Sequence, residues 1–555
     1  MNIDHNTAES SAPLLEFYGD PRKASSQQTE DCLRKQGDSA RLAHDRAVWR
    51  ASVLDVVPGD FLSFISLMGS SWRSSVYNLA GDMLRTVDSW KNAVSYILLR
   101  QVVEEMKLLY SIAFPMIITG LLLYGKSAIS MFFMGQIGKD TLAGGSLAIG
   151  IANITGISVL SGLAMGMEPI SSQACGAKQW PLMGQTLQRT ITILALVCVP
   201  ISILWLYVEP ILLLCGQDPT ISSIASVYLA YSLPDLFLQS LINPLKIYLR
   251  TQNITLPFML GSAFGLLVHA PVNYILVYQT KLGIHGIAIA VSLTDLTVLA
   301  VVLLYVHFSS TCAKSWQGWS MEHCFQEWTQ ILCLAIPSCV SVCLEWWWYE
   351  LMILLSGILS SESVATMGIL LQATSLVYIF PSSLSQAVST RVGNTLGAGE
   401  PYRARFSSFT ALGCSVLTSL LALLFMTMAR NTWGHIFTDD NAILSLTAAA
   451  LPIVGLCELG NCPQTTGCGA LRGSARPSLG ASVNLFSFYV VGLPVAAMMG
   501  FAMHKGLLGL WLGLLAAQIA CAAVMIVVLT RTDWETEAER ARELTGTDPE
   551  SGRPK

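Results

Sequence analysis

Long apolar segments follow one another along most of the chain. We count twelve, with approximate bounds 108–134, 142–164, 184–208, 221–242, 255–278, 285–308, 329–356, 363–388, 404–428, 442–463, 477–500 and 506–530. An apolar run of about 20 residues is long enough to cross the hydrocarbon core of a bilayer as an α-helix. The pattern therefore predicts an all-α integral membrane protein with twelve transmembrane helices.

The second half of the chain repeats the first at an offset of about 222 residues. Pro115 recurs as Pro337, and Arg250 recurs as Arg472. Cys-Gly-Ala at 175–177 has its counterpart in Leu-Gly-Ala at 396–398. Each half holds six segments, an even number, so both halves enter the membrane in the same direction. The repeat predicts two parallel six-helix lobes with a substrate path between them.

The repeat and the polar stretches around it set the expected domain boundaries. We expect an N-lobe over 105–308, an inter-lobe loop over 309–328 and a C-lobe over 329–530. Residues 1–104 are polar and mixed, which predicts a largely disordered cytoplasmic region. Short apolar patches within 51–100 are compatible with amphipathic helices on the membrane surface. Residues 531–555 are expected to form a cytoplasmic tail.

Composition agrees with a membrane protein. The 555 residues are 53% hydrophobic and only 12% charged, whereas soluble chains are about 25% charged. The net charge of -4 gives no reason to expect a nucleic-acid partner. The cysteines lie mostly in apolar segments, and the spacing of Cys457, Cys462 and Cys468 fits no zinc pattern. We therefore expect no metal site, no cofactor and no enzymatic activity.

Basic residues predict how the chain is oriented. One set of connections carries most of them, and the alternate set carries few and several acids. The richer set holds Lys178, Lys246, Arg250, Lys314, Arg391, Arg403, Arg405, Arg472 and Arg476. That side is expected to be cytoplasmic, which places both termini in the cytoplasm. No signal peptide or targeting sequence is visible, so the plasma membrane and an endomembrane (Golgi, endosome or vacuole) stay open.

Three acids fall inside segments of the C-terminal half. Glu345 and Glu350 lie in the seventh segment, and Glu458 lies in the tenth with Asn461. A charged side chain at membrane depth is costly unless it is paired or faces a cavity, so each is a candidate for function. Glu345 precedes Trp346, and an acid beside an aromatic face can hold a cation. Glu345 and Glu350 point about 140° apart on a helix, so we expect that they do not face the same spot.

Bland interpretations accompany these candidates. Trp346–Trp348 is also compatible with an interfacial aromatic belt, and Glu350 with a packing role. Gln372 in the eighth segment serves equally well as a substrate contact or as a helix–helix hydrogen bond. In the less charged N-terminal half, Lys126 either extends toward the interface or pairs with an acid of the facing half. Asp235 is the acid that we single out there.

The stretches after the second and eighth segments share a glycine-rich pattern. They run over 168–178 and 389–399, and the second contains Arg391, Gly393, Asn394 and Gly397. No phosphate-binding loop spacing is present. We interpret both as loops that act as a structural hinge or gate, together with the matched prolines Pro115 and Pro337.

The chain resembles the multidrug and toxic compound extrusion (MATE) transporters, and among them the plant DETOXIFICATION proteins. The resemblance covers roughly 105–530. It rests on the ordered motifs Pro115-Met-Ile-Ile-Thr-Gly120, Met167-Glu-Pro-Ile-Ser-Ser-Gln-Ala-Cys-Gly-Ala177, Cys343-Leu-Glu-Trp-Trp347, Arg391-Val-Gly-Asn-Thr-Leu-Gly-Ala-Gly399 and Gly469-Ala-Leu-Arg-Gly473. It implies two six-helix lobes that export organic compounds in exchange for protons or, less often, sodium.

The resemblance also implies roles for particular residues. Essential acids of the family match Glu345 and Glu458, and Glu350 matches a second acid of the seventh helix. An acid of some animal members falls on Gln372, and the helix-one aspartate of many bacterial members has no counterpart in 121–126. The chain departs from those members at both positions.

The sequence therefore predicts a monomeric, proton-coupled antiporter working by alternating access. Its expected substrates are small organic molecules, cationic or neutral rather than anionic, since the central charges are acidic. A lipid-linked oligosaccharide flippase of related architecture and a membrane receptor or scaffold remain as alternatives. Acidic central charges disfavour the first, and the duplicated six-helix unit disfavours the second.

Overall fold

The computed structural model describes residues 70–309 and 311–546, with side chains from residue 99 onward except at position 323. This part of the chain is helical throughout and contains no strand. It divides into two units, Met1–Leu98 and Leu99–Lys555. In the first unit only the helical backbone of 70–98 is described, and all that follows concerns the second.

The N-lobe is built from long helices with short breaks. Its elements are α3 (Ser70–Ile137), α4 (Lys139–Ala152), η1 (Asn153–Ile157), α5 (Ser158–Ala164), α6 (Met167–Gly176), α7 (Trp180–Leu206), α8 (Val208–Leu214), α9 (Pro219–Tyr231), α10 (Leu233–Thr251), α11 (Leu256–Tyr274), η2 (Ile275–Gln279) and α12 (Ile284–Ser309). A short helix, α13 (Met321–Cys324), lies in the connection to the C-lobe.

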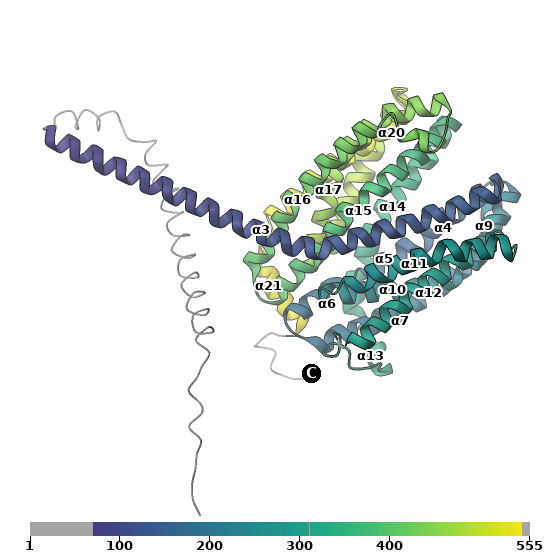
Figure 1. Cartoon of the computed structure of the whole chain (residues 1–555), viewed down its shortest axis with the longest axis horizontal. Helices are drawn as coiled ribbons and strands as arrows, with labels where there is room; N and C mark the ends of the chain where they lie inside the picture. The colour runs from purple at the N-terminus through teal and green to yellow at the C-terminus, as the bar shows by residue number, and fades with distance from the viewer. Residues whose placement is uncertain (1–69, 310, 547–555) are drawn as a thin grey trace, which may run out of the picture. The chain divides into compact units, whose positions relative to one another are not determined.

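The C-lobe repeats this arrangement. Its elements are α14 (Trp328–Leu359), α15 (Ser361–Gly397), α16 (Pro401–Ala429), η3 (Gly434–Ile436), α17 (Asn441–Gly473), α18 (Pro477–Asn484), η4 (Leu485–Gly492), α19 (Leu493–Ala497), η5 (Met498–Ala502) and α20 (Gly506–Thr530), followed by α21 (Trp534–Thr545). Within residues 99–546, α4–α12 and α14–α20 form two groups that meet near α21 (Figure 1).

The twelve predicted spans are confirmed. Eleven helices of the described chain are long and apolar enough to cross a membrane, and the bent pair α9 and α10 supplies the twelfth. The repeat extends to the helix starts. The Asp218 carboxylate caps α9 through the Thr220 amide at 2.8 Å, and Asp440, 222 residues later, caps α17 through the Ala442 amide at 2.8 Å. The two lobes therefore use the same capping chemistry to begin equivalent helices.

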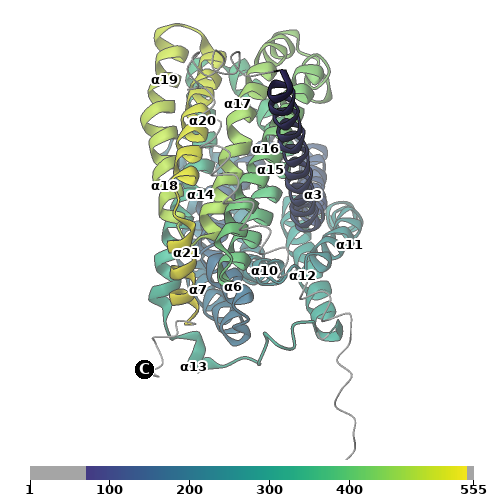
Figure 2. The same cartoon turned by 90° about the vertical axis from the view of Figure 1, so that its left-hand side faces the viewer.

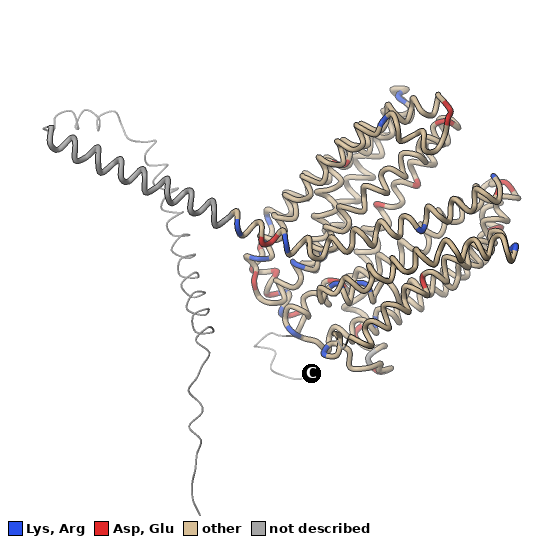
Figure 3. Tube along the Cα trace, viewed as in Figure 1, with Lys and Arg blue, Asp and Glu red and all other residues tan. Residues whose placement is uncertain are grey.

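Each lobe packs its own apolar core. In the N-lobe, Leu194 and Leu229 are fully buried among residues of α4–α12. In the C-lobe, Trp348 and Trp511 are almost fully buried beside Phe488. Lys and Arg gather mainly at the end of the bundle near α21 (Figure 3). We call this the basic end, and it is the side for which the sequence predicts a cytoplasmic position.

The two lobes touch each other closely at the basic end. A Cβ added to Gly176 of α6 would lie 2.0 Å from the Asn394 carbonyl oxygen, and one added to Gly397 of α15 would lie 2.0 Å from that of Gln173. These glycines are the repeat counterparts of each other. Their missing side chains let the backbone of one lobe approach the backbone of the other. We call this region the inter-lobe contact.

The interpretation of 168–178 and 389–399 as loops is wrong. Residues 167–176 form α6, and α15 continues to Gly397. The glycines serve close helix packing rather than turns, and a helix face can carry glycine wherever another backbone must come near. Only Gly399, at φ 74°, adopts the left-handed conformation that ends a helix.

The two ends of the chain are more helical than expected. Residues 70–104 belong to α3, so the prediction of disorder does not hold for them, while 1–69 lie outside the described residues. In the C-terminal tail, α21 packs against α6, α15 and α16 (Figure 2). Burial lowers the pKa of the Arg476 guanidinium, and the Glu537 carboxylate of α21, 3.5 Å away, opposes that change.

A side chain at Gly397 should prevent the lobes from closing. Gly397→Ala places a methyl group against the Gln173 carbonyl oxygen, and neither backbone can yield without moving a whole helix. We expect the distance between spin labels at Lys178 and Arg405 to increase in electron–electron resonance measurements. The matched control is Gly413→Ala in α16, where the new methyl group meets nothing within 4 Å. Equal label distances in the two variants would contradict this account of the contact.

Candidate functional site

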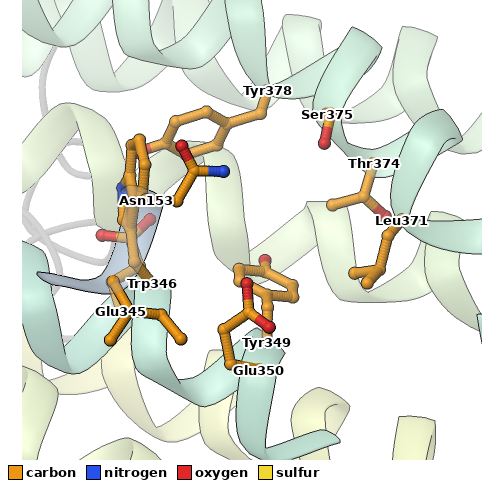
Figure 4. Close-up of a pocket in the computed structure, with 10 residues that line it drawn as sticks. Asn153, Glu345, Trp346, Tyr349, Glu350, Leu371, Thr374, Ser375 and Tyr378 are labelled. Atoms are coloured by element: carbon orange, nitrogen blue, oxygen red, sulfur yellow. The ribbon is translucent and has the colours of Figure 1, made fainter. Parts of the chain in front are cut away.

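A cavity of about 350 Å³ lies between η1 of the N-lobe and the helices α14 and α15 of the C-lobe. Figure 4 shows its α14 side chains opposite those of α15. Its lining comprises Asn153, Ile154, Glu345, Trp346, Tyr349, Glu350, Leu371, Thr374, Ser375 and Tyr378. The lining holds two carboxylates and three aromatic rings, and it holds no lysine or arginine.

Glu345 and Glu350 both line this cavity, contrary to the expectation that they would not face the same spot. The helical angle between them is about 140°, but the cavity extends around α14 and takes in Trp346 and Tyr349 between them (Figure 4). Glu345 is 9% exposed, and Glu350 is only half-buried. The cavity therefore has an inner acid and an outer acid.

The three consecutive tryptophans occupy three different environments. Trp346 lines the cavity. Trp347 is exposed and donates through Nε1 to the Ile154 carbonyl oxygen of the N-lobe at 3.3 Å. Trp348 is fully buried and packs on Phe488 with ring centroids 5.6 Å apart. The three rings do not form a belt, because successive positions of a helix point about 100° apart.

Glu458 lies inside the C-lobe and is 1% exposed. The Asn461 side-chain amide donates to its Oε2 at 2.8 Å, and the Cys462 thiol approaches the same oxygen at 3.7 Å. Gln518 of α20 reaches the Asn461 carbonyl oxygen at 3.4 Å. These are neutral partners, and the described ion pairs include none to Glu458.

A polar network joins the surroundings of the two C-lobe acids. Tyr378 and Gln464 direct their polar groups toward the Glu345 carboxylate. Gln464 in turn donates to Asn484 at 3.1 Å, and the Thr465 hydroxyl lies 3.2 Å from Gln464 and 3.4 Å from Asn461. Asn461 is thus a link within this network. The acids influence each other electrostatically, and each can hold a proton without losing a basic partner.

Gln372 lies outside the cavity lining. Its Oε1 accepts from the Tyr124 hydroxyl of α3 at 3.4 Å, a long hydrogen bond between the two lobes. The structure thus favours the helix–helix interpretation of Gln372 over that of a substrate contact.

A second group of buried charges lies inside the N-lobe. Lys126 Nζ pairs with Asp295 Oδ1 at 2.7 Å, and Gln239 donates to the other oxygen of Asp295 at 2.9 Å. Asp235 interacts with both Lys126 and Asp295. Lys126 therefore neither extends to the interface nor pairs with the facing lobe. Sequence reasoning overlooked Asp295, although the rule that found the other acids applies to it equally, since it stands mid-way along α12.

The residues assigned to a gate or hinge connect the two lobes. Arg391 makes two 3.0 Å hydrogen bonds to Glu105 of α3, and Asn394 donates to the Thr251 carbonyl oxygen of α10 at 3.2 Å. A Cβ at Gly393 would lie 1.9 Å from Ser172 Oγ. Pro115 and Pro337 lie inside α3 and α14. Glu105 was not anticipated, because nothing in a helix-end acid shows which lobe it will face.

Glu168 is the charged centre of the inter-lobe contact. It is 0% exposed and pairs with Arg250 of the N-lobe at 2.7 Å and with Arg472 of the C-lobe at 3.6 Å. Gln173 adds a hydrogen bond to the Gly473 carbonyl oxygen at 3.0 Å. Among the described residues no group of three His, Cys, Asp or Glu side chains is placed to hold a metal ion.

Comparison with known proteins follows from this geometry. The sequence model of the MatE family matches residues 115–275 and 337–498, one stretch in each lobe. Protein DETOXIFICATION 48 of Arabidopsis thaliana is 55% identical over 448 residues, covering 80% of this chain and 84% of that relative. Protein DETOXIFICATION 49 of the same plant is 54% identical over 445 residues, covering 80% and 88%.

Solved structures show the same arrangement. The crystal structure of the eukaryotic MATE transporter AtDTX14 matches with a TM-score of 0.77 at 33% identity, covering 80% of this chain and 99% of that one. The Vibrio cholerae MATE transporter VcmN in the bent form matches with a TM-score of 0.69 at 17% identity, covering 80% and 99%, a likeness of fold alone.

Breaking the N-lobe ion pair should destabilise the protein strongly. Lys126→Met leaves the Asp295 carboxylate buried without its cation, and we expect a loss of about 3–5 kcal/mol in the free energy of unfolding. The double variant Lys126→Met, Asp295→Asn should recover much of it. Arg403→Met removes an exposed pair with Glu400 and should cost at most about 1 kcal/mol. Similar losses for Lys126→Met and Arg403→Met in detergent unfolding curves would refute this.

Proposed function

The chain belongs to the MatE family of efflux transporters, and from that premise we propose that it is a proton-coupled antiporter that exports organic cations. It is a multi-pass membrane protein of the plant DETOXIFICATION type, a transporter rather than an enzyme. The proposal concerns the coupling ion, the substrate class and the direction. The observation that carries it is the buried, unpaired Glu345 at the inner end of a cavity that both lobes line.

Proton coupling is supported by the partners of the C-lobe acids. Burial penalises the charged form of a carboxylic acid, unless a cation or hydrogen-bond donors compensate. Glu345 and Glu458 have neutral polar neighbours such as Tyr378 and Asn461. A proton can therefore neutralise either acid. The N-lobe acid Asp295, by contrast, already holds the ammonium group of Lys126.

A cationic substrate is supported by the lining of the cavity. Glu345 and Glu350 provide negative charge, and Trp346, Tyr349 and Tyr378 provide aromatic faces. Such faces attract cations, with the strongest effect where water is excluded. An organic cation and a proton then compete for the same carboxylate, which is the minimal requirement of exchange. A flippase for a pyrophosphate lipid would need basic groups, and this lining has none.

Alternating access explains why the lobes approach each other most closely at one end. We place the basic end in the cytoplasm by the charge asymmetry of the connections, together with both termini. The structure then represents the state that is closed to the cytoplasm. Protons from the outer side displace the substrate, and opening of the inter-lobe contact exposes the acids to the cytoplasm. One proton crossing a potential of 100 mV supplies about 2.3 kcal/mol.

The remaining assignments are parts of the same proposal. We place the protein as a monomer in the plasma membrane or an endomembrane. The coupling ion is a proton rather than sodium, because the described residues offer no grouped acids for a metal ion. No cofactor takes part in the exchange.

Replacing Glu345 tests the proposal. In proteoliposomes with an imposed pH gradient, Glu345→Gln should lower the transport of ethidium, a fluorescent organic cation, at least tenfold, because the neutral amide binds neither a proton nor a cation. Glu458→Gln should lower it to a similar extent. The control is Glu539→Gln on the exposed surface of α21, which should transport like the unaltered protein.

Two outcomes would reject the proposal. Undiminished proton-driven transport by Glu345→Gln would remove that acid from the mechanism. A dependence of transport on a sodium gradient, with no response to a proton uncoupler, would replace the coupling ion.

A further inference from the structure

Glu168 is shared by two arginines that the repeat relates to each other. Arg250 and Arg472 lie 222 residues apart and approach the two oxygens of the Glu168 carboxylate from opposite lobes. The repeat position of Glu168 in the C-lobe is Thr390. The arginine is therefore duplicated and the acid is not, so two guanidinium groups depend on a single buried carboxylate.

The two arginines differ in how firmly they hold Glu168. Arg250 pairs with it at 2.7 Å within the N-lobe and also donates to Gln386 of the C-lobe. Arg472 lies 3.6 Å away, which is longer than a hydrogen bond. Its Nη2 donates instead to Ser385 of its own lobe at 2.9 Å. Arg472 is thus the weaker of the two contacts, and the one that must break when the lobes separate.

Arg472 also acts on the coupling acid. Its positive charge interacts with the Glu345 carboxylate, and also with Tyr378 and Cys468 nearby. Arg250 has no such interaction with Glu345 among those described. Gln464, Cys468 and Arg472 follow one another at intervals of four, so they share one face of α17. Eight residues of helix rise about 12 Å, which separates the backbone of Arg472 from that of Gln464, the neighbour of Glu345.

A small cavity continues this face. About 10 Å³ in volume, it is lined by Ser338, Ser341, Cys468 and Arg472 among others, and that is close to the space that one water molecule needs. Ser341 accepts from Asn484 at 3.1 Å, and Asn484 accepts from Gln464 at 3.1 Å. Polar groups therefore extend from the surroundings of Arg472 to those of Glu345, with little apolar material between.

We propose that Arg472 is a positioning residue that couples protonation of Glu345 to contact between the lobes, because its charge is divided between Glu345 and Glu168. This rests on the proposed proton-coupled function. With the lobes in contact, Glu168 draws Arg472 away, and Glu345 takes up a proton more readily. When the lobes separate, Arg472 loses Glu168, its charge favours the Glu345 carboxylate, and the proton leaves toward the cytoplasm. By linkage, protonation of Glu345 also favours lobe contact.

Other groups around Glu345 must be separated from this effect. The titratable and charged groups that interact with it or share its cavity come from α14, α15, α17 and α20, and are Tyr349, Glu350, Tyr378, Glu458, Cys468, Arg472 and Cys521. The infrared band of a protonated carboxyl group reports its titration in the purified protein without any substrate. The part of the band that disappears in Glu345→Gln belongs to Glu345, and Glu458→Gln and Glu350→Gln identify the other contributions.

The repeat supplies a matched control for the titration. In Arg472→Gln the midpoint of the Glu345 band should move to higher pH, by about tenfold in proton concentration for charges roughly 10 Å apart. Arg472→Lys should stay within twofold of the unaltered protein. Arg250→Gln removes the same charge from the same acid, and should also stay within twofold. Equal midpoints in Arg472→Gln and Arg250→Gln would overturn the proposal.

A second measurement tests the link to the inter-lobe contact. The distance between spin labels at Lys178 and Arg405 should respond to pH in the unaltered protein, with lobe contact favoured by acid. Arg472→Gln should abolish that response, whereas Arg250→Gln should weaken contact at every pH and keep the response. A response that survives in Arg472→Gln would reject the proposal.

Two further outcomes have definite meanings. If Arg472→Gln does not fold, Glu168→Gln takes its place, since it frees Arg472 and should move the Glu345 midpoint to lower pH; an unchanged midpoint would count against the proposal. If the midpoints behave as expected and proton gradients drive no transport, the proposed function fails while the charge relation between Arg472 and Glu345 stands.

Discussion

The pairing of one buried carboxylate with two arginines holds together the end at which the two lobes of the described structure approach each other most closely. Glu168 is fully buried, and removing either guanidinium leaves charge without compensation. Around it, Gly176 and Gly397 bring the backbones of α6 and α15 into contact. Such a contact is polar and lacks the large apolar area of a lobe core. It can therefore separate and re-form while each lobe stays intact.

The buried charges of the two lobes serve opposite purposes. In the N-lobe, Lys126 and Asp295 neutralise each other, so the pair is stable at any ordinary pH. In the C-lobe, Glu345 and Glu458 have neutral hydrogen-bond partners, and their charge depends on what binds there. A duplicated scaffold has thus kept its helices and caps and has let the ionisable groups diverge. That divergence places exchange chemistry in the C-lobe and a fixed ion pair in the N-lobe.

Prediction from the sequence succeeded where a single helix carries the information. Glu345 and Glu458 were found because each is an acid inside an apolar run, and both lie in buried, polar surroundings. It failed where two segments must meet. The partner of Lys126 was sought in the facing lobe, although Asp295 lies in its own lobe. The glycines at 393 and 397 were taken as loop residues, because composition does not distinguish a turn from a close helix contact.

The sequence alone determined the twelve helices, the two parallel lobes and the candidates for proton exchange. These follow from hydrophobic length, an internal offset of about 222 residues and the cost of charge in a bilayer, all of which act along one dimension. Only the tertiary structure decided which acid has a cation, that Glu345 and Glu350 line one cavity, and that Glu168 joins Arg250 to Arg472. The reason is physical. The energy of a charge depends on what surrounds it in space, and those neighbours come from helices up to 300 positions away, as Gln173 and Gly473 do.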